Sequence, residues 1–377
     1  MGTDPRTLPP LPSLLQDLVV LFLLPSRIFL HILGTLLCPW WKRSPSWTLF
    51  QQIVLPLLQL PMALSPARLR DASNVLTVAR VAFARCIYGA TVEVAEGVGF
   101  RGHWVRSKGD EGTDCEADAV LYWIHGGGFA TFDSLTAINV MPSVQKRCSA
   151  LGVVVKIFSL DYTLTPAAVF PTQIDQGLVF IWCVRSEHYS RTSIYILTTM
   201  APTTPIILLG DSAGGNLCLA LLQRLRTASL PLPKSAVLLS PCVDASLSAA
   251  SWARLEGLDI VPHAAAMRMS TAYLPPSAEI EGLEEGDEQV TVHHPLVSPI
   301  NADLTGFPPL LILYGDSEAM IDDIERFAEK AKRFVEADVI VGPGMPHDYP
   351  LIGPWLGDEV ERAWCQIASF ICRTAPS

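Results

Sequence analysis

Short aliphatic runs alternate with longer amphipathic stretches from about residue 90 to the end of the chain. The runs predict strands at 90–95, 119–125, 153–160, 205–210, 235–240, 309–315 and 338–342. Helical spacing of apolar residues predicts helices at 170–186, 213–226, 321–334 and 358–373. Several strands are apolar on both faces, which is expected where helices cover both sides of a sheet. The pattern predicts an α/β fold with a mostly parallel, doubly wound sheet.

The N-terminal part follows a different pattern, with apolar pieces at residues 11–41 and 49–64. The first piece is interrupted before the ~20 apolar residues of a clean membrane span, at Asp17, Pro25, Arg27 and His31. It ends in side chains that favour a membrane interface, namely Trp40, Trp41, Lys42 and Arg43. Two interpretations stay open: residues 11–41 anchor or dock the protein on a membrane, or both pieces fold over the core as a helical cap.

These patterns divide the chain into three parts. We expect a hydrophobic segment at 1–45 (membrane anchor or cap), cap helices at 46–89, and a catalytic domain at 90–377 with a cap insertion near 245–290. The prolines at 25, 56 and 61 predict short helices in the cap. The expected localisation is membrane-associated, for example at the endoplasmic reticulum, with the cytoplasm as the alternative.

Composition and charge exclude several classes of partner. The 377 residues are 50% hydrophobic, enough for one large domain with an appendage. The net charge of −10 and the absence of a lysine or arginine run argue against binding to nucleic acid. The cysteines show no zinc-site spacing and no cluster with histidine, which argues against a zinc site, and we expect no metal and no organic cofactor.

A nucleophile motif joins the predicted strand at 205–210 to the helix at 213–226. Residues 210–214 read G-D-S-A-G. A serine on such a sharp turn has unfavourable dihedral angles and needs small neighbours, and the N-terminus of the helix directs N–H groups at the reacting oxygen. Ser212 is therefore the candidate nucleophile.

A second motif, H-G-G-G-F at 125–129, follows the predicted strand at 119–125. Successive glycines let backbone N–H groups approach a substrate carbonyl closely. We expect the N–H groups of Gly126, Gly127 and Ala213 to form an oxyanion hole, each donor stabilising the transition state by roughly 3 kcal/mol.

Together, HGGGF and GDSAGG resemble the hormone-sensitive lipase family of α/β-hydrolases, which includes arylacetamide deacetylases, steryl acetyl hydrolases and many microbial esterases. The similarity extends over roughly residues 90–375. D-Y-T-L-T-P at 161–166 and L-L-S-P-C-V-D at 238–244 are similar to two further motifs of the family, although Thr163 and Cys242 replace its arginine and tryptophan. The resemblance implies an α/β-hydrolase fold with a helical cap.

The resemblance also implies the other catalytic residues, because α/β-hydrolases place serine, acid and histidine in that order along the chain. Alignment of E-A-M-I-D-D at 318–323 with the family's acid motif places Glu318 at the acid position, with Asp316 as the alternative. His347, in G-P-G-M-P-H-D-Y-P, is similar to the family's histidine motif and is the expected base.

The expected reaction is hydrolysis of a carboxylic ester through an acyl-enzyme on Ser212. The apolar N-terminal pieces favour a small hydrophobic ester substrate, such as an acetylated sterol, terpenoid or polyketide. Two alternatives remain: an acyltransferase or a dehydratase or cyclase on the same fold, and a non-catalytic protein that binds small molecules.

Overall fold

The computed structural model describes residues 13–37, 47–108, 117–185, 204–275 and 290–375, with the backbone alone for 13–24 and 182–185. The tryptophans and basic residues at 40–43 and the acidic run at 279–288 lie outside the described residues.

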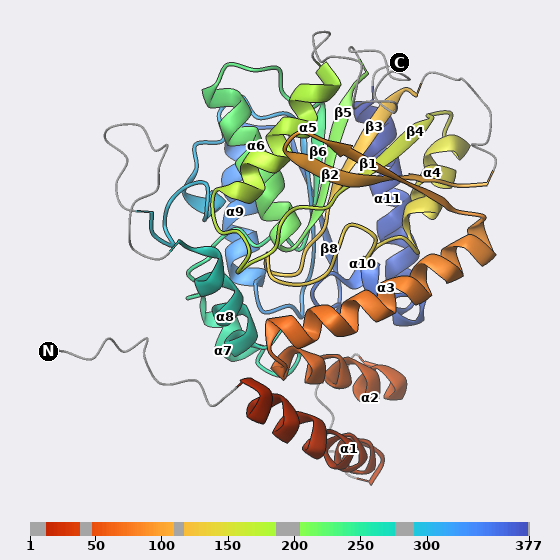
Figure 1. Cartoon of the computed structure of the whole chain (residues 1–377), viewed down its shortest axis with the longest axis vertical. Coiled ribbons are helices and arrows are strands. Elements are labelled where there is room, and N and C mark those ends of the chain that lie inside the picture. The colour runs from red at the N-terminus through yellow and green to blue at the C-terminus, as the bar shows by residue number, and fades with distance from the viewer. Residues whose placement is uncertain (1–12, 38–46, 109–116, 186–203, 276–289, 376–377) are drawn as a thin grey trace, which may run out of the picture.

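An eight-stranded sheet runs through the centre of the molecule in the order β1-β2-β4-β3-β5-β6-β7-β8 (Figure 1). Its strands are β1 (Thr91–Gly97), β2 (Phe100–Arg106), β3 (Ala119–Ile124), β4 (Val155–Leu160), β5 (Ile206–Asp211), β6 (Ser235–Leu239), β7 (Leu310–Gly315) and β8 (Ala337–Gly342). β2 pairs antiparallel with both β1 and β4, and all the other pairs are parallel. The predicted α/β fold with a mostly parallel sheet is confirmed.

Side chains of each central strand alternate between two hydrophobic cores. In β3, Tyr122 and Ile124 belong to the core on one face of the sheet, whereas Leu121 and Trp123 belong to the core on the other. The first core is shared with α5 (Thr172–Arg185), α6 (Ala213–Thr227) and α9 (Ile321–Phe334), and the second with α4 (Met141–Ala150) and α11 (Asp358–Thr374). Burial on both faces explains why these strands are continuously apolar.

The short C-terminal elements connect β8 to α11. They are α10 (Tyr349–Ile352) and the 3-10 helix η5 (Pro354–Leu356). A further 3-10 helix, η4 (Pro299–Asn301), precedes β7.

Four helical elements precede the sheet in the chain: α1 (Ser13–Leu37), α2 (Leu49–Leu58), the 3-10 helix η2 (Leu60–Ala63) and α3 (Pro66–Tyr88). They lie at the lower end of the molecule in Figure 1. A capping box formed by Thr48 and Gln51 starts α2. In the part of the chain whose side chains the structure describes, no helix is both long and apolar enough to cross a membrane.

The prediction that prolines break the N-terminal helices is wrong at two positions. α1 continues through Pro25, and α2 continues through Pro56. Pro56 is buried, so packing against the core offsets the hydrogen bond that the ring removes from α2. The structure gives no comparable reason for Pro25, which is exposed.

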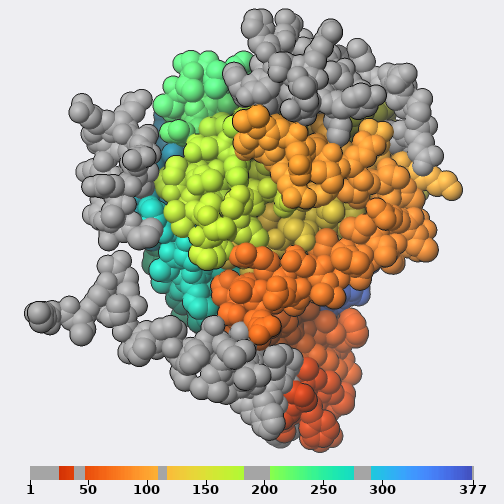
Figure 2. Space-filling view, in the orientation of Figure 1, coloured from red at the N-terminus to blue at the C-terminus, as the bar shows by residue number. Residues whose placement is uncertain are grey.

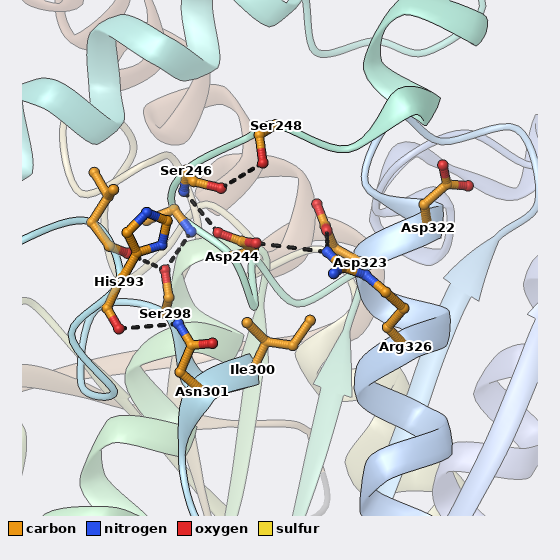
Figure 3. A network of polar contacts seen from close by, with 12 residues as sticks. Asp244, Ser246, Ser248, His293, Ser298, Ile300, Asn301, Asp322, Asp323 and Arg326 are labelled. Carbon is orange, nitrogen blue, oxygen red and sulfur yellow. Dashed lines mark hydrogen bonds and ion pairs between the residues drawn. The ribbon is translucent and has the colours of Figure 1, made fainter.

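The insertion after β6 contains α7 (Ala250–Arg254) and α8 (His263–Tyr273). Figure 3 shows the polar network where this insertion leaves and rejoins the core. The Ser298 hydroxyl accepts a hydrogen bond from Ala245 N–H at 2.8 Å, which joins the two ends of the insertion. Arg326 of α9 pairs with Asp244 at 3.7 Å and with the buried Asp323. The insertion is therefore attached firmly at its base.

Candidate active site

Ser212 lies on the turn between β5 and α6, with φ 50° and ψ −115°. Its N–H donates to Leu239 O at 2.8 Å, which fixes the turn against β6. The neighbouring glycine is required sterically, because a Cβ on Gly214 would lie 1.9 Å from Ile124 O. The structure thus gives Ser212 the strained strand-to-helix position that the motif predicts.

The glycine loop follows β3 and approaches Ser212 from the next strand. Gly127 and Gly128 have φ of 99° and 59°, a region that favours glycine. The Tyr162 hydroxyl donates to His125 O at 2.9 Å, and the two rings stack with centroids 4.2 Å apart. The loop is held in place by these contacts.

Of the three N–H groups expected to form the oxyanion hole, one is already hydrogen-bonded within the protein. Gly126 N–H donates to Asp211 Oδ2 at 2.9 Å, so this donor is engaged within the protein. Among the hydrogen bonds of the described residues, none uses Gly127 N–H as donor. Ala213 begins α6, where helical N–H groups have no partner within the helix. The N–H groups of Gly127 and Ala213 are therefore the expected donors that can still form hydrogen bonds with a substrate.

Glu318 and His347 are brought together at the ends of β7 and β8. Glu318 is fully buried, and its Oε2 lies 3.9 Å from His347 Nδ1. The same oxygen accepts hydrogen bonds from the Ser240 hydroxyl at 2.5 Å and from Gly315 N–H at 3.2 Å. Burial raises the pKa of Glu318 above its ordinary value, against the opposing effect of His347. Asp316 is exposed and accepts a hydrogen bond from Gly344 N–H instead.

A further carboxylate, Asp348, contacts the other nitrogen of the imidazole. Asp348 Oδ2 lies 3.1 Å from His347 Nε2. Burial alone would lower the pKa of His347, but Asp348 and the carboxylates of Glu318 and Asp259 raise it above its ordinary value. Among the hydrogen bonds of the described residues, none joins His347 to Ser212, so Nε2 must leave Asp348 to accept a proton from the serine.

Aromatic and sulfur-containing side chains cover the glycine loop. Phe129 stacks on Tyr273 of α8 with ring centroids 3.8 Å apart. Met269 of α8 packs so closely on Gly128 that a Cβ there would lie 2.4 Å from its Sδ. Arg70 of α3 donates a hydrogen bond to Ala130 O at 3.0 Å. The N-terminal helices and the insertion therefore both border the loop.

Sequence reasoning missed three residues that contact the acid or the base: Ser240, Asp259 and Asp348. Ser240 and Asp348 stand inside motifs that were recognised for other residues, so their positions were available in the sequence. Asp259 lies in the irregular insertion, where no local pattern marks it. Across the described residues, no group of three or more His, Cys, Asp or Glu side chains is arranged to hold a metal ion.

Comparison with known proteins places these features in context. A family model described as alpha/beta hydrolase fold matches residues 121–351. An esterase of Acinetobacter venetianus is 29% identical over 71% of this chain and 80% of its own length. An acetyl-hydrolase of Streptomyces hygroscopicus is 30% identical over 60% of this chain and 64% of its own length.

A similar result comes from solved structures. A hormone-sensitive lipase from a metagenome library superposes with a TM-score of 0.66 at 25% identity, covering 85% of this chain and 97% of its own. By sequence alone, the hormone-sensitive lipase of Mus musculus is also similar, at 30% identity over 43% of this chain and 20% of its own length.

Proposed function

Since the chain belongs to the hormone-sensitive lipase family of α/β-hydrolases and is a carboxylic ester hydrolase, we propose that Ser212, Glu318 and His347 form its catalytic triad. The observation that carries the assignment is the buried Glu318 carboxylate facing His347 Nδ1 at 3.9 Å. Ser212 lies on a strained turn at the end of β5 in the same sheet. Exposed Asp316 makes no such contact, which favours Glu318 as the acid.

In the proposed reaction, His347 takes the proton of Ser212 while the serine oxygen attacks the ester carbonyl. The oxyanion accepts hydrogen bonds from Gly127 and Ala213 N–H, and Gly126 contributes mainly by bonding Asp211 and so shaping the loop. The alcohol leaves with the proton, and water then attacks the acyl-enzyme to release the acid. Glu318 holds the imidazole and stabilises its charged form.

The experiment that tests the triad compares Glu318→Gln with Asp316→Asn on p-nitrophenyl acetate. A triad acid changed to its amide lowers kcat by about 10⁴-fold in serine proteases, so we expect a loss of about 10³-fold or more for Glu318→Gln. Asp316→Asn should stay within about threefold of wild type, since its carboxylate faces solvent. The reverse result would assign the acid to Asp316.

We propose small hydrophobic esters, acetyl esters among them, as the substrate class. One relative is an acetyl-hydrolase, and Met269, Phe129 and Tyr273 give the glycine loop apolar surroundings. Close packing of Met269 on Gly128 favours a short acyl group. Turnover of p-nitrophenyl acetate, butyrate and octanoate should therefore fall with chain length, and faster turnover of octanoate would refute the acetyl preference.

We further propose that the N-terminal helices dock on a lipid surface, and that residues 46–89 act as cap helices of the catalytic domain. Residues 25–37 of α1 lie at the surface in Figure 2, and so does α3. Their exposed apolar side chains are Phe29, Leu30, Leu33, Leu36 and Leu37 in α1, and Val75, Leu76, Val78, Phe83 and Ile87 in α3. Exposed apolar faces of this kind suit the boundary between lipid headgroups and acyl chains.

Charge favours anionic lipid as the occupant of this face. Residues 1–90 hold eight basic and three acidic side chains, a net +5, whereas residues 91–377 hold 19 basic and 34 acidic, a net −15. The positive end of the chain is thus the one that bears the exposed apolar helices. Anionic lipids attract such a surface by about 1 kcal/mol per basic residue near it.

Co-sedimentation with phosphatidylcholine vesicles, with and without phosphatidylserine, tests the docking proposal. Val75 and Val78 are 72% and 71% exposed one helical turn apart, so replacing both by glutamate should abolish binding to phosphatidylserine vesicles. Val98→Glu is the matched control, because Val98 is 70% exposed on the turn between β1 and β2. The proposal would be overturned if the wild-type protein did not bind vesicles. It would also be overturned if the wild type were a dimer and the double variant a monomer, because the exposed valines would then form a contact between two copies of the chain.

A further inference from the structure

Asp259 lies between the two loops that carry the proposed acid and base. It belongs to the insertion, between α7 and α8, and is only 2% exposed. Its Oδ2 accepts a hydrogen bond from Ala319 N–H at 2.8 Å, and its Oδ1 accepts one from His347 N–H at 2.9 Å. Ala319 follows Glu318 directly, so one carboxylate holds the backbone beside the acid and the backbone of the base.

The surroundings of Asp259 keep its carboxylate in one orientation. Oδ1 also accepts the N–H of Ile260 at 2.7 Å. The backbone oxygen of Asp259 accepts a hydrogen bond from the Gln59 side chain, at the junction of α2 and η2. Hydrogen bonds to an ionised acceptor are about twice as strong as neutral ones, so this carboxylate joins the insertion rigidly to both loops, while the backbone oxygen of Asp259 joins it to the N-terminal helices.

We propose that Asp259 is a positioning residue that sets the separation between Glu318 and His347. The inference rests on the proposed triad. Oε2 and Nδ1 are 3.9 Å apart, beyond hydrogen-bonding distance, so a small displacement of either loop decides whether the pair closes during the reaction. A misplacement of about 1 Å can lower a reaction rate by about 100-fold.

Asp259 also acts on the imidazole by its charge. It is one of the carboxylates that raise the pKa of His347, together with Asp348 and Glu318. Asp211 lies in the same group, since it interacts electrostatically with His347 and Asp348. Removing the charge at 259 leaves the other three acids in place, and it should lower the pKa of the base.

Asp322 provides a matched control from the same region. Its Oδ2 accepts the N–H of Ser251 at 2.9 Å, and it pairs with Arg254. It therefore fastens the insertion to α9 through a carboxylate, as Asp259 does to the loops, but it accepts no hydrogen bond from Ala319 or His347. Asp322→Asn measures what loss of an anchoring carboxylate does to stability alone.

The test measures the melting temperature, kcat, KM and the pH dependence of kcat/KM for p-nitrophenyl acetate in Asp259→Asn, Asp259→Glu and Asp322→Asn. For Asp259→Asn we expect kcat to fall about 100-fold with KM within about threefold, and activity to extend to lower pH. Asp259→Glu keeps the charge, so its acidic limb should match wild type while kcat stays reduced. Asp322→Asn should keep wild-type kcat and pH dependence.

Wild-type kcat and pH dependence in Asp259→Asn, with a melting temperature lowered as in Asp322→Asn, would show a purely structural role and overturn the proposal. If Asp259→Asn does not fold, kcat of Asp259→Glu decides, because wild-type kcat there would contradict a positioning role. Failure of the triad itself would appear separately, as wild-type hydrolysis that survives Ser212→Ala.

Discussion

Replacing Ser240 by alanine removes the hydroxyl that supports the buried Glu318 carboxylate. Ser240 is fully buried, donates to Glu318 Oε2 at 2.5 Å and accepts the N–H of Asp348 at 3.0 Å. The substitution therefore removes a stabilising donor from the acid and leaves the backbone beside the base without its acceptor. Both effects act on the proposed acid–base pair.

The size of the effect follows from the first of these hydrogen bonds. A hydrogen bond to a charged group contributes about 1.5–3 kcal/mol, and 1.4 kcal/mol is a factor of ten. The hydroxyl lowers the pKa of Glu318 against the larger opposing effect of burial, so its loss raises that pKa further. We expect kcat/KM at pH 7 to fall by about 10- to 100-fold, and the acidic limb to move to higher pH.

Initial rates of p-nitrophenyl acetate hydrolysis from about pH 5.5 to 9.5, corrected for the uncatalysed reaction, measure both kcat/KM at pH 7 and the position of the acidic limb. Ser298→Ala is the control, because Ser298 is also fully buried and hydrogen-bonded, but it holds the ends of the insertion. It should lose about 1–3 kcal/mol of stability and keep the wild-type pH dependence. Wild-type activity in Ser240→Ala, or a limb that moves to lower pH, would refute this reasoning.

Three further substitutions test other parts of the structure. Asp348→Asn removes a carboxylate that raises the pKa of His347, so the acidic limb of kcat/KM should move to lower pH; an unchanged limb would show that the contact at Nε2 does not persist in solution. Gly214→Ala puts a Cβ 1.9 Å from Ile124 O and should yield no folded protein by circular dichroism; a folded, active variant would contradict the elbow geometry. Leu55→Ala empties a site that is 1% exposed and should cost about 2–5 kcal/mol in denaturant unfolding, whereas a cost below about 1 kcal/mol would mean that α2 packs loosely on the core.

The sheet could be predicted from sequence because its central strands are buried on both faces. Residues 119–124 have no exposed side chain, and such runs are continuously apolar. β2 was missed because its sequence, F-R-G-H-W-V-R, mixes charged and small residues with the apolar ones. It lies near the edge, where it pairs antiparallel with its neighbours and needs no continuous apolar run.

The helix α3 was expected only as part of a cap region. Its 23 residues carry apolar side chains on the exposed side as well as the buried one, with Val75 at 72% exposure and Leu69 at 5%. Helical periodicity depends on a contrast between the two sides, and this helix provides little. The same feature supports the proposed docking surface.

The residues of the candidate site also differ in how far the sequence could predict them. Ser212 and the glycine loop are specified by local steric demands, so short motifs reveal them. Asp259 meets His347 from 88 residues away, and Ser240 meets Glu318 from 78 residues away. Such contacts exist only once the insertion and the strand ends are folded against one another, and no local pattern encodes them.

The most direct test of the central claim is labelling with a fluorophosphonate, which reacts with an activated serine. We predict a single modification on the peptide that contains Ser212, at a rate lowered by at least about 100-fold in His347→Ala and absent in Ser212→Ala. Modification of another residue, or hydrolysis of p-nitrophenyl acetate that persists in Ser212→Ala, would contradict the account.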